Sequence, residues 1–342
     1  MSSVDRIVVF GAGSVGCYLG GRLQAAGAPV RMVGRATLAD AVRRHGLSLT
    51  DLHGADCRVE PAQVDFVVDE PAAAADAGLV LVTVKSAATE ASGRALAPVL
   101  APGTCVISLQ NGIDNAVLLQ SLLPQCRVLA GMVPFNIVNR GEGRFHQGSD
   151  GQLMVQASPT LSRYLPTFAV AGLALNLRDD MRAVLWGKLL LNLNNSINAL
   201  CGLPLKEELS QRDFRRCLAA AQREGLQLLQ TSGETVAAVT PLPPRLLPRL
   251  LTLPDWVFRR AASRMLAIDP LARSSMWEDL QAGRPTEIAW LNGELLRLAA
   301  RLGLPAPVNQ RLTDLIRDAE QGGRRDWSAP ELLAQLQSHR QH

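Results

Sequence analysis

The chain has 342 residues, of which 47% are hydrophobic and 19% charged, and its formal net charge is +4. This length suits two domains better than one core, and the small charge without a basic run excludes a nucleic-acid-binding protein. No apolar run reaches the roughly 18 residues of a membrane-spanning helix, and the first residues lack a signal-peptide pattern, so we expect a cytoplasmic protein without a membrane partner. The six cysteines show no C-x-x-C spacing, which predicts reduced core thiols and no metal site.

The first predicted elements form a phosphate-binding turn within "RIVVFGAGSVGCYLGGRLQAAG". A short buried strand at 7–10 is followed directly by the G-x-G-x-x-G pattern and then by a helix that ends at Gly27. The first glycine permits a tight turn, the second lets the backbone approach a pyrophosphate, and the third allows close packing of helix on strand. The first amides of the helix would face the anion. We therefore predict that a dinucleotide binds at Gly11, Ala12, Gly13, Ser14, Val15 and Gly16.

The second predicted strand, "PVRMVGR", bears on the choice of nicotinamide cofactor. Proteins that bind NAD usually place Asp or Glu at the end of this strand, where it binds the ribose 2′-hydroxyl. Here the strand ends in Gly34-Arg35, and the next acid is Asp40. An arginine can pair with a 2′-phosphate through two hydrogen bonds. The pattern favours NADP, with a surface role for Arg35 as the alternative.

Two further predicted strands, "GLVLVTVK" and "TCVISLQNG", are each followed by a helical segment. This alternation predicts a parallel sheet whose functional loops lie at the carboxyl ends of its strands. Lys85 and Asn111 both fall at such ends. Lys85 could reach the adenosine side of the cofactor and Asn111 the nicotinamide and substrate, although either could be an ordinary turn residue.

Strand signals stop at about residue 179, and helices are predicted for 180–200, 210–232, 243–266, 275–282, 286–303 and 307–321. Prolines concentrated in 240–254 should start or break helices there. We predict an α/β fold with an N-terminal Rossmann-type parallel-sheet domain at 1–178 and an all-helical C-terminal domain at 179–325. The tail at 326–342 is expected to be weakly ordered or a short helix. A cleft between two such domains is a common ligand site.

The helix predicted within "VLWGKLLLNLNNSINAL" carries polar residues in an apolar body. At about 100° per residue, one face collects Lys188, Asn192, Asn195 and Ser196, while Asn194 and Asn198 lie away from it. A solvated face would explain such a stripe. Short amides with a single cation are unusual on a solvated face, however, so a substrate site is an equal alternative.

A second polar segment, "ARSSMWEDLQAGRPTEIAWLNG", begins with two serines and carries acids near its predicted helix starts. Helix capping explains Ser274 or Ser275, and also Thr286, but it does not explain both serines. A binding role therefore stays open for Ser275 and Glu287.

At these residues the chain resembles the ketopantoate reductases (2-dehydropantoate 2-reductases) over nearly its whole length. The matching motifs are "FGAGSVGCYLGGRL", "VTVKS", "LQNGI", "LWGKLLLN", "SSMWEDLQAGRPTEIAWLNG" and "LPAPVN". The resemblance implies NADPH-dependent reduction of ketopantoate to pantoate, in pantothenate and coenzyme A biosynthesis, by hydride transfer to the ketone carbon of a small 2-oxo acid. A homodimer is also left open.

The resemblance assigns roles residue by residue. It makes Lys188 the catalytic acid and Glu287 a carboxylate beside the substrate hydroxyl and the cofactor. It makes Asn192 and Ser275 substrate contacts and Asn111 a contact to substrate and cofactor. It places Arg35 and Lys85 around the NADP 2′-phosphate.

Two positions depart from the family pattern. Ser196, a further candidate substrate contact, and Ala272 stand where the family commonly has asparagines, and Arg273 could either replace the lost contact or lie on the surface. These changes leave open another 2-oxo acid, ketone or imine as substrate. A sensor that binds NADP without turnover is a third alternative. The histidines lie outside every shared motif, so a histidine acid would have to be His146.

Overall fold

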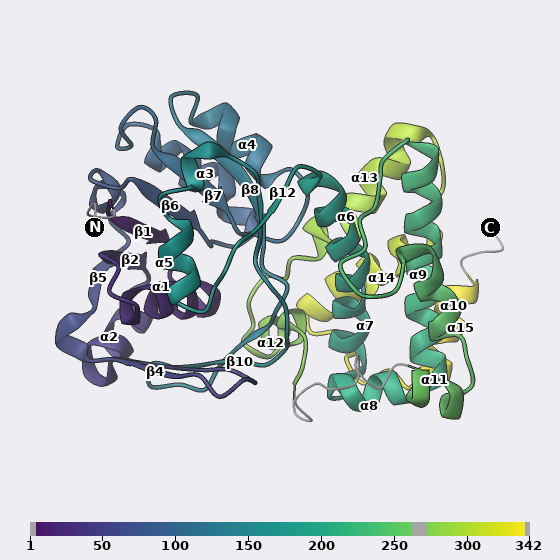
Figure 1. Ribbon diagram of the computed structural model, residues 1–342. Coiled ribbons are helices and arrows are strands. Elements are labelled where there is room, and N and C mark those ends of the chain that lie inside the picture. The colour runs from purple at the N-terminus through teal and green to yellow at the C-terminus, as the bar shows by residue number, and fades with distance from the viewer. Residues whose placement is uncertain (1–4, 262–271, 339–342) are drawn as a thin grey trace. The chain divides into compact units, whose positions relative to one another are not determined.

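The computed structural model describes residues 5–261 and 272–338 (Figure 1). The chain forms two compact units, Met1–Met181 and Arg182–His342. The first unit holds the strands and the second is helical among its described residues. The predicted α/β architecture, with a parallel sheet followed by a helical region, is confirmed.

The first unit is built on an eight-stranded sheet in the order β12-β11-β8-β7-β6-β1-β2-β5. Neighbouring strands from β5 to β8 are parallel, and β11 runs antiparallel to β8. The six parallel strands have the order typical of dinucleotide-binding folds. The strands are β1 (Ile7–Phe10), β2 (Val30–Gly34), β5 (Asp65–Val68), β6 (Leu79–Val82), β7 (Cys105–Ser108), β8 (Arg127–Met132), β11 (Met154–Gln156) and β12 (Asn176–Arg178).

Helices cover both faces of this sheet (Figure 1). Because successive side chains of a strand point to opposite faces, Ile7 and Val9 pack with α1, α2 and α5, while Val8 and Phe10 pack with α3 and α4. All four side chains are buried, which explains why β1 is apolar throughout rather than alternating. The helices are α1 (Ser14–Ala25), α2 (Ala36–His45), α3 (Thr89–Leu96), α4 (Asn115–Leu122) and α5 (Leu165–Val170), with 3₁₀ turns η1 (Pro61–Gln63), η2 (Pro71–Ala74), η3 (Ser86–Ala88) and η4 (Pro159–Leu161).

A second, four-stranded sheet in the order β4-β3-β10-β9 was not predicted from the sequence. Its strands are β3 (Leu47–Thr50), β4 (Asp56–Val59), β9 (Ile137–Asn139) and β10 (Arg144–Gln147). Leu47, Leu49 and Phe145 bury their side chains in the core beside α1. A buried ion pair of 3.2 Å between Arg22 of α1 and Asp51 ties the sheet to that helix.

The second unit is organised around the 20-residue helix α9, which packs against α10, α13, α14 and α15 (Figure 1). Its helices are α6 (Met181–Asn192), α7 (Asn194–Cys201), α8 (Leu205–Ser210), α9 (Arg212–Thr231), α10 (Leu247–Leu251), α11 (Asp255–Ala261), α12 (Ser275–Gln281), α13 (Asn292–Leu302), α14 (Pro307–Glu320) and α15 (Ala329–Ser338), with 3₁₀ turns η5 (Pro244–Leu246) and η6 (Ile288–Trp290). None of the described helices has the length and apolar character needed to span a bilayer.

Three predicted helices differ from the observed ones. The helix expected at 180–200 is divided into α6 and α7 at Leu193, although Leu193 keeps helical backbone angles and its amide donates to the Leu189 carbonyl at 3.0 Å. The helix expected at 243–266 is broken into η5, α10 and α11, as the prolines there favour, and its last residues lie outside the described part of the chain. The helix expected at 286–303 starts only at Asn292, after the separate turn η6.

The described part of the C-terminal tail contains helix α15 of the helical unit. Leu332 and Leu336 of α15 are buried, and the helix packs against α9 and α14. Of the two expectations for this segment, the structure shows the short helix within its described residues. The six cysteines are free, and all but Cys57 are buried, as predicted.

Candidate active site

The glycine turn after β1 has the geometry of a dinucleotide-binding turn. Gly11 has φ +98°, and a Cβ on it would lie 2.5 Å from the backbone nitrogen of Val84. A Cβ on Gly16 would lie 2.8 Å from the carbonyl oxygen of Gly11, so helix and strand could not pack as they do. At Gly13, by contrast, the nearest atom to an added Cβ is 3.9 Å away, so the space beside this backbone is open. These are the three requirements expected of the motif.

The start of α1 supplies amide groups to this open space. The helix begins at Ser14, and its first backbone hydrogen bond runs from the Cys17 amide to the Gly13 carbonyl, 2.8 Å away. The amides of Ser14, Val15 and Gly16 precede that bond, and no side chain of the described residues caps Gly13. Unpaired amides at a helix start attract anions. The residues present therefore fit a pyrophosphate, and Gly13 is the position that would face it.

Arg35 directly follows β2 and is exposed at the start of α2. The neighbouring backbone is tied to the glycine turn, because the amides of Gly11 and Ala12 donate to the Val33 carbonyl at 2.9 and 2.8 Å. An acid that the sequence reading missed also reaches this edge. Asp69 follows β5, is exposed, and its amide donates to the Gly34 carbonyl at 3.0 Å. The sequence signal for Asp69 was its position directly after β5, the strand that pairs with β2.

Lys85 and Asn111 follow the paired strands β6 and β7, as predicted. Lys85 is exposed and Asn111 is partly buried. The Ser86 hydroxyl donates to the Asn111 backbone carbonyl at 2.7 Å, and the Asn115 side chain donates to the same oxygen. The two loops are thus tied to each other through the residue next to Lys85.

A buried polar network stabilises these loops, and the sequence reading missed it. The Gln110 amide donates to the Thr89 hydroxyl at 2.7 Å, and that hydroxyl lies 2.8 Å from Asn115 Oδ1. Ser108 donates to Gln110 Oε1 at 2.9 Å. Because buried side chains that satisfy one another fix a single arrangement, this network holds the Asn111 backbone in place.

Lys188 lies on α6 of the helical unit. It is partly buried, and the preceding Gly187 lets the 234–240 segment cross the helix, since a Cβ there would collide with the Ala237 carbonyl oxygen. Burial lowers the pKa of Lys188 to about 8, while the nearby Glu287 carboxylate acts in the opposite direction by favouring the ammonium. Glu287 is partly buried and immediately precedes η6. The lysine can therefore gain or lose a proton near neutral pH, as a general acid must.

The predicted polar stripe is shorter than the sequence suggested. Lys188 and Asn192 lie one turn apart on α6, and both are partly buried. Beyond Leu193, Asn195 is partly buried on α7, but Ser196 is fully buried and its hydroxyl donates to the Leu193 carbonyl at 2.9 Å. The structure thus keeps the Lys188–Asn192 pair and turns Ser196 inward, which does not favour the predicted substrate contact for that serine.

Ser274 and Ser275 have separate roles at the start of α12. Ser274 caps the helix, because its hydroxyl oxygen accepts from the Trp277 amide at 3.1 Å. Ser275 is exposed in the first turn. Arg273 donates to the Gly202 carbonyl and stacks over the Trp277 ring at 4.3 Å, so its guanidinium is engaged within the unit.

Neither Ala272 nor His146 adds a polar group to these residues. Ala272 is buried, and its carbonyl accepts from the Leu205 amide at 2.9 Å. His146 lies in β10, where its Nδ1 is 2.8 Å from the Thr50 hydroxyl of the neighbouring strand β3. This places His146 in the second sheet rather than after a strand of the large sheet, which does not favour it as the acid.

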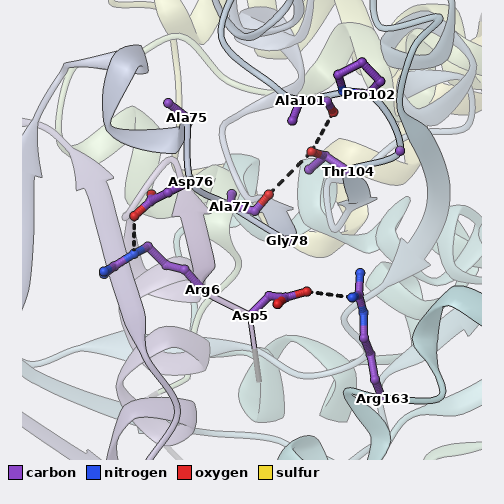
Figure 2. A pocket seen from close by; sticks show the side chains of 11 residues that line it. Asp5, Arg6, Ala75, Asp76, Ala77, Gly78, Ala101, Pro102, Thr104 and Arg163 are labelled. Atoms are coloured by element: carbon purple, nitrogen blue, oxygen red, sulfur yellow. Dashed lines mark hydrogen bonds and ion pairs between the residues drawn. The ribbon is translucent and has the colours of Figure 1, made fainter. Parts of the chain in front are cut away.

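A surface depression of about 400 Å³ lies at the amino ends of the parallel strands, opposite to the edge that holds the glycine turn (Figure 2). All its lining residues except Arg163 directly precede β1, β6 or β7, whereas the glycine turn and Asn111 follow strands. Its charges are paired, with Arg6 on Asp76 at 2.7 Å and Arg163 on Asp5 at 2.6 Å. The Thr104 hydroxyl is also bonded to the Ala101 carbonyl (Figure 2). These contacts are structural.

Two family models cover most of the chain. Residues 7–160 match "Ketopantoate reductase PanE/ApbA", and residues 180–320 match "Ketopantoate reductase PanE/ApbA C terminal". The chain belongs to the ketopantoate reductase family. It is an oxidoreductase that acts on a CH–OH group, and the family is NAD(P)-dependent.

Relatives match along nearly their whole length. A 2-dehydropantoate 2-reductase of Archaeoglobus fulgidus is 28% identical over 330 residues, covering 93% of this chain and 99% of its own. The crystal structure of a PanE/ApbA family ketopantoate reductase from Ralstonia eutropha JMP134 superposes with a TM-score of 0.78 at 31% identity, covering 93% and 99%. A ternary structure of D-mandelate dehydrogenase with NADH and anilino(oxo)acetate shares the fold, with a TM-score of 0.75 at 18% identity over 93% and 99%.

Proposed function

We propose that this ketopantoate reductase relative reduces a 2-oxo acid to the 2-hydroxy acid with NADPH, and that ketopantoate is the first substrate to test. The product would then be pantoate, a precursor of pantothenate and coenzyme A. The observation that carries the proposal is Lys188, a partly buried lysine with a pKa of about 8 beside Glu287. The shared name of the curated relatives supports the choice of substrate.

The proposed reaction uses Lys188 as the proton donor. Bound NADPH would supply the hydride to the ketone carbon. As negative charge develops on the ketone oxygen, the Lys188 ammonium stabilises it and transfers its proton there, which leaves a neutral amine and a hydroxyl group. Glu287 keeps part of the lysine population protonated despite burial and accepts a hydrogen bond from the product hydroxyl. Solvent then returns the proton to Lys188.

Polar side chains would hold the substrate against this lysine. We assign Asn192, one turn after Lys188, to the substrate oxygens. Ser275, exposed in the first turn of α12, would donate to the substrate carboxylate, where the helix start also favours negative charge. Asn111 would contact both substrate and cofactor.

NADPH is proposed over NADH because of the residues at two strand ends. Arg35 and Lys85 are both exposed there and would pair with the 2′-phosphate. The open backbone at Gly13 would receive the pyrophosphate. Asp69 opposes this preference, because a carboxylate repels the phosphate, so cofactor choice must be measured.

A second candidate is a reductase of the same type that acts on another 2-oxo acid, ketone or imine. Two features favour it: the buried Ser196 is engaged with Leu193, and Ala272 has no polar side chain. The lost donors would weaken ketopantoate binding by about 10- to 100-fold, the effect of one hydrogen bond to a charged group. A sensor that binds NADP without turnover is disfavoured by the retained Lys188 and Glu287.

The test is the rate of NADPH oxidation with a set of 2-oxo acids that includes ketopantoate and aromatic 2-oxo acids. We expect turnover of at least one 2-oxo acid. We also expect reduction of ketopantoate, with a KM higher than in family members that have asparagines in place of Ser196 and Ala272. Turnover of a ketone that has no carboxylate would show that the substrates are ketones rather than 2-oxo acids. NADPH binding without oxidation of any carbonyl compound would contradict the enzyme proposal and favour the sensor.

The assembly and location of the enzyme are also proposals. A dimeric ketopantoate reductase from Staphylococcus aureus has the same fold at 18% identity and a TM-score of 0.69. We propose that this chain forms a homodimer in the cytoplasm. Light scattering on the purified chain would decide between monomer and dimer.

A further inference from the structure

Glu208, on α8, is a fully buried carboxyl group that has no place in the reaction proposed above. Its Oε2 accepts hydrogen bonds from two side-chain amides of α7, Asn198 at 2.7 Å and Asn194 at 3.4 Å. Both asparagines are themselves buried. These are the two asparagines that the helical pattern placed outside the predicted substrate stripe.

Two oxygens in this cluster lack a hydrogen-bond donor among the described residues. They are Glu208 Oε1 and Asn194 Oδ1, both buried. A proton on Glu208 Oε1 would remove the negative charge from a carboxyl group whose second oxygen receives no hydrogen bond from the described residues. The hydrogen-bonding pattern therefore fits a carboxylic acid rather than a carboxylate.

Electrostatics at Glu208 agree with a neutral side chain. Burial raises the pKa of Glu208 to about 8, and the two amides lower it only in part. The nearby charged or titratable groups are thiols or are already engaged. Cys201 of α7 and Cys217 of α9 are buried thiols whose pKa values burial raises. Arg215 of α9 donates to the Leu209 and Ser210 carbonyls and to Asp255, Asp213 pairs with Arg216, and Arg273 donates to Gly202.

Asn198, one of the two asparagines that bind Glu208, also binds the start of α12. Asn198 Oδ1 accepts from the Ser274 backbone amide at 2.8 Å, while its Nδ2 donates to Glu208 and to the Leu203 carbonyl, 2.9 Å away. The Ser274 hydroxyl donates to the Asn195 carbonyl at 3.2 Å. Ser274 is the cap of α12, and Ser275 is its first residue. A chain of hydrogen bonds thus leads from α8 through α7 to the residue before Ser275.

We propose that Glu208 is a positioning residue, which as a neutral carboxylic acid orients Asn198 and thereby fixes the first turn of α12 that presents Ser275 to the substrate carboxylate. This role rests on the proposed reduction of a 2-oxo acid. Loss of the proton would place an unpaired charge in the cluster and loosen the turn that holds the substrate. The effect would appear in KM for the 2-oxo acid rather than in the hydride-transfer step.

The protonation state can be tested without any enzyme assay. In unfolded chains glutamate ionises near pH 4.5, whereas the folded chain holds the Glu208 proton to about pH 8. The folded state thus binds more protons between these values, and wild-type stability falls with rising pH relative to a chain with glutamine there. Thermal unfolding of the full chain at pH 5 to 8.5 should show Glu208→Gln gaining several degrees over wild type as pH rises. Glu207→Gln, an exposed change on the same helix, should show no such gain.

Kinetics then test the positioning role. With the 2-oxo acid that the enzyme reduces, wild-type KM should rise about 2- to 10-fold between pH 7 and 8.5, the effect of one hydrogen bond. In Glu208→Gln, KM should rise less than in wild type over this range, because only the titration of Lys188 remains, and kcat should be unchanged at pH 7. The proposal is overturned if Glu208→Gln fails to fold, loses stability relative to wild type as pH rises, or keeps the wild-type rise in KM. If wild type reduces no 2-oxo acid, the reaction proposal fails, while the unfolding comparison still reports on Glu208.

Discussion

Lys188 and Glu208 show the same physical effect on groups of opposite charge. Burial disfavours the charged form, so it lowers the pKa of the lysine and raises that of the glutamate, and both reach about 8. The lysine retains a nearby carboxylate, Glu287, which keeps it partly protonated. Glu208 has only amide donors. Lys188 is therefore suited to transfer a proton near neutral pH, and Glu208 is suited to keep its proton there.

Sequence analysis identified Lys188 as a candidate site residue but not Glu208. The reason is the distance along the chain between each residue and its polar partners. Lys188 and Asn192 lie four residues apart in one helix, so helical periodicity places them on one face. Glu208 meets Asn194 and Asn198 from a different helix, 14 and 10 residues further along the chain. That contact depends on how α8 packs against α7, which periodicity does not give.

The predicted preference for NADPH over NADH depends mainly on one residue, Arg35. We expect Arg35→Ala to raise KM for NADPH about 10- to 100-fold, because a charged hydrogen bond to the 2′-phosphate is lost, and to leave KM for NADH unchanged. Arg44→Ala, an exposed change on the same helix, is the control. Steady-state kinetics with both cofactors is the measurement. Equal use of NADPH and NADH by the wild-type enzyme would refute the assignment.

At the scale of elements, the sequence predicted long helices better than their interruptions. The helices α9, α12 and α14 lie within a few residues of their predicted bounds. The interruption between α6 and α7 at Leu193 was missed because apolar residues continue through it. As a result, the stripe predicted from one straight helix extended to Ser196, which is buried.

Arg215 explains how the proline-rich segment is held. Its side chain is fully buried, and it donates to the Leu251 and Leu253 carbonyls at 3.1 and 2.9 Å and to Asp255 at 2.8 Å. Sequence analysis could not find this role, because an arginine in an amphipathic helix is ordinarily exposed.

Removing this arginine should weaken the helical unit. Arg215→Met would leave several buried carbonyls without donors and is expected to lower the free energy of unfolding by about 3–5 kcal/mol. The measurement is urea unfolding followed by circular dichroism. Arg216→Met, at the exposed neighbouring position, should change it by less than about 1 kcal/mol. Equal effects of the two changes would show that Arg215 does not anchor the segment.

At the scale of the whole molecule, the order of motifs predicted the family and the class of fold. The glycine turn and the apolar strands were sufficient for the parallel sheet, since the central strands β1, β6 and β7 are buried on both faces. The second sheet was missed because it is assembled by pairing β3 with β10 across a long separation in sequence. Such pairing leaves no local signal.

The central claim is that Lys188 is the proton donor in an NADPH-dependent reduction of a 2-oxo acid. The most direct measurement is kcat against pH for wild type and Lys188→Ala, with Lys206→Ala as an exposed control. The ammonium is the proton donor, so wild-type kcat for reduction should fall as pH rises through about 8. Lys188→Ala should lower kcat about 10²- to 10⁴-fold and lose this pH dependence, while NADPH binding measured by fluorescence is unchanged. Near-normal turnover in Lys188→Ala, with the same fall above pH 8, would contradict the claim.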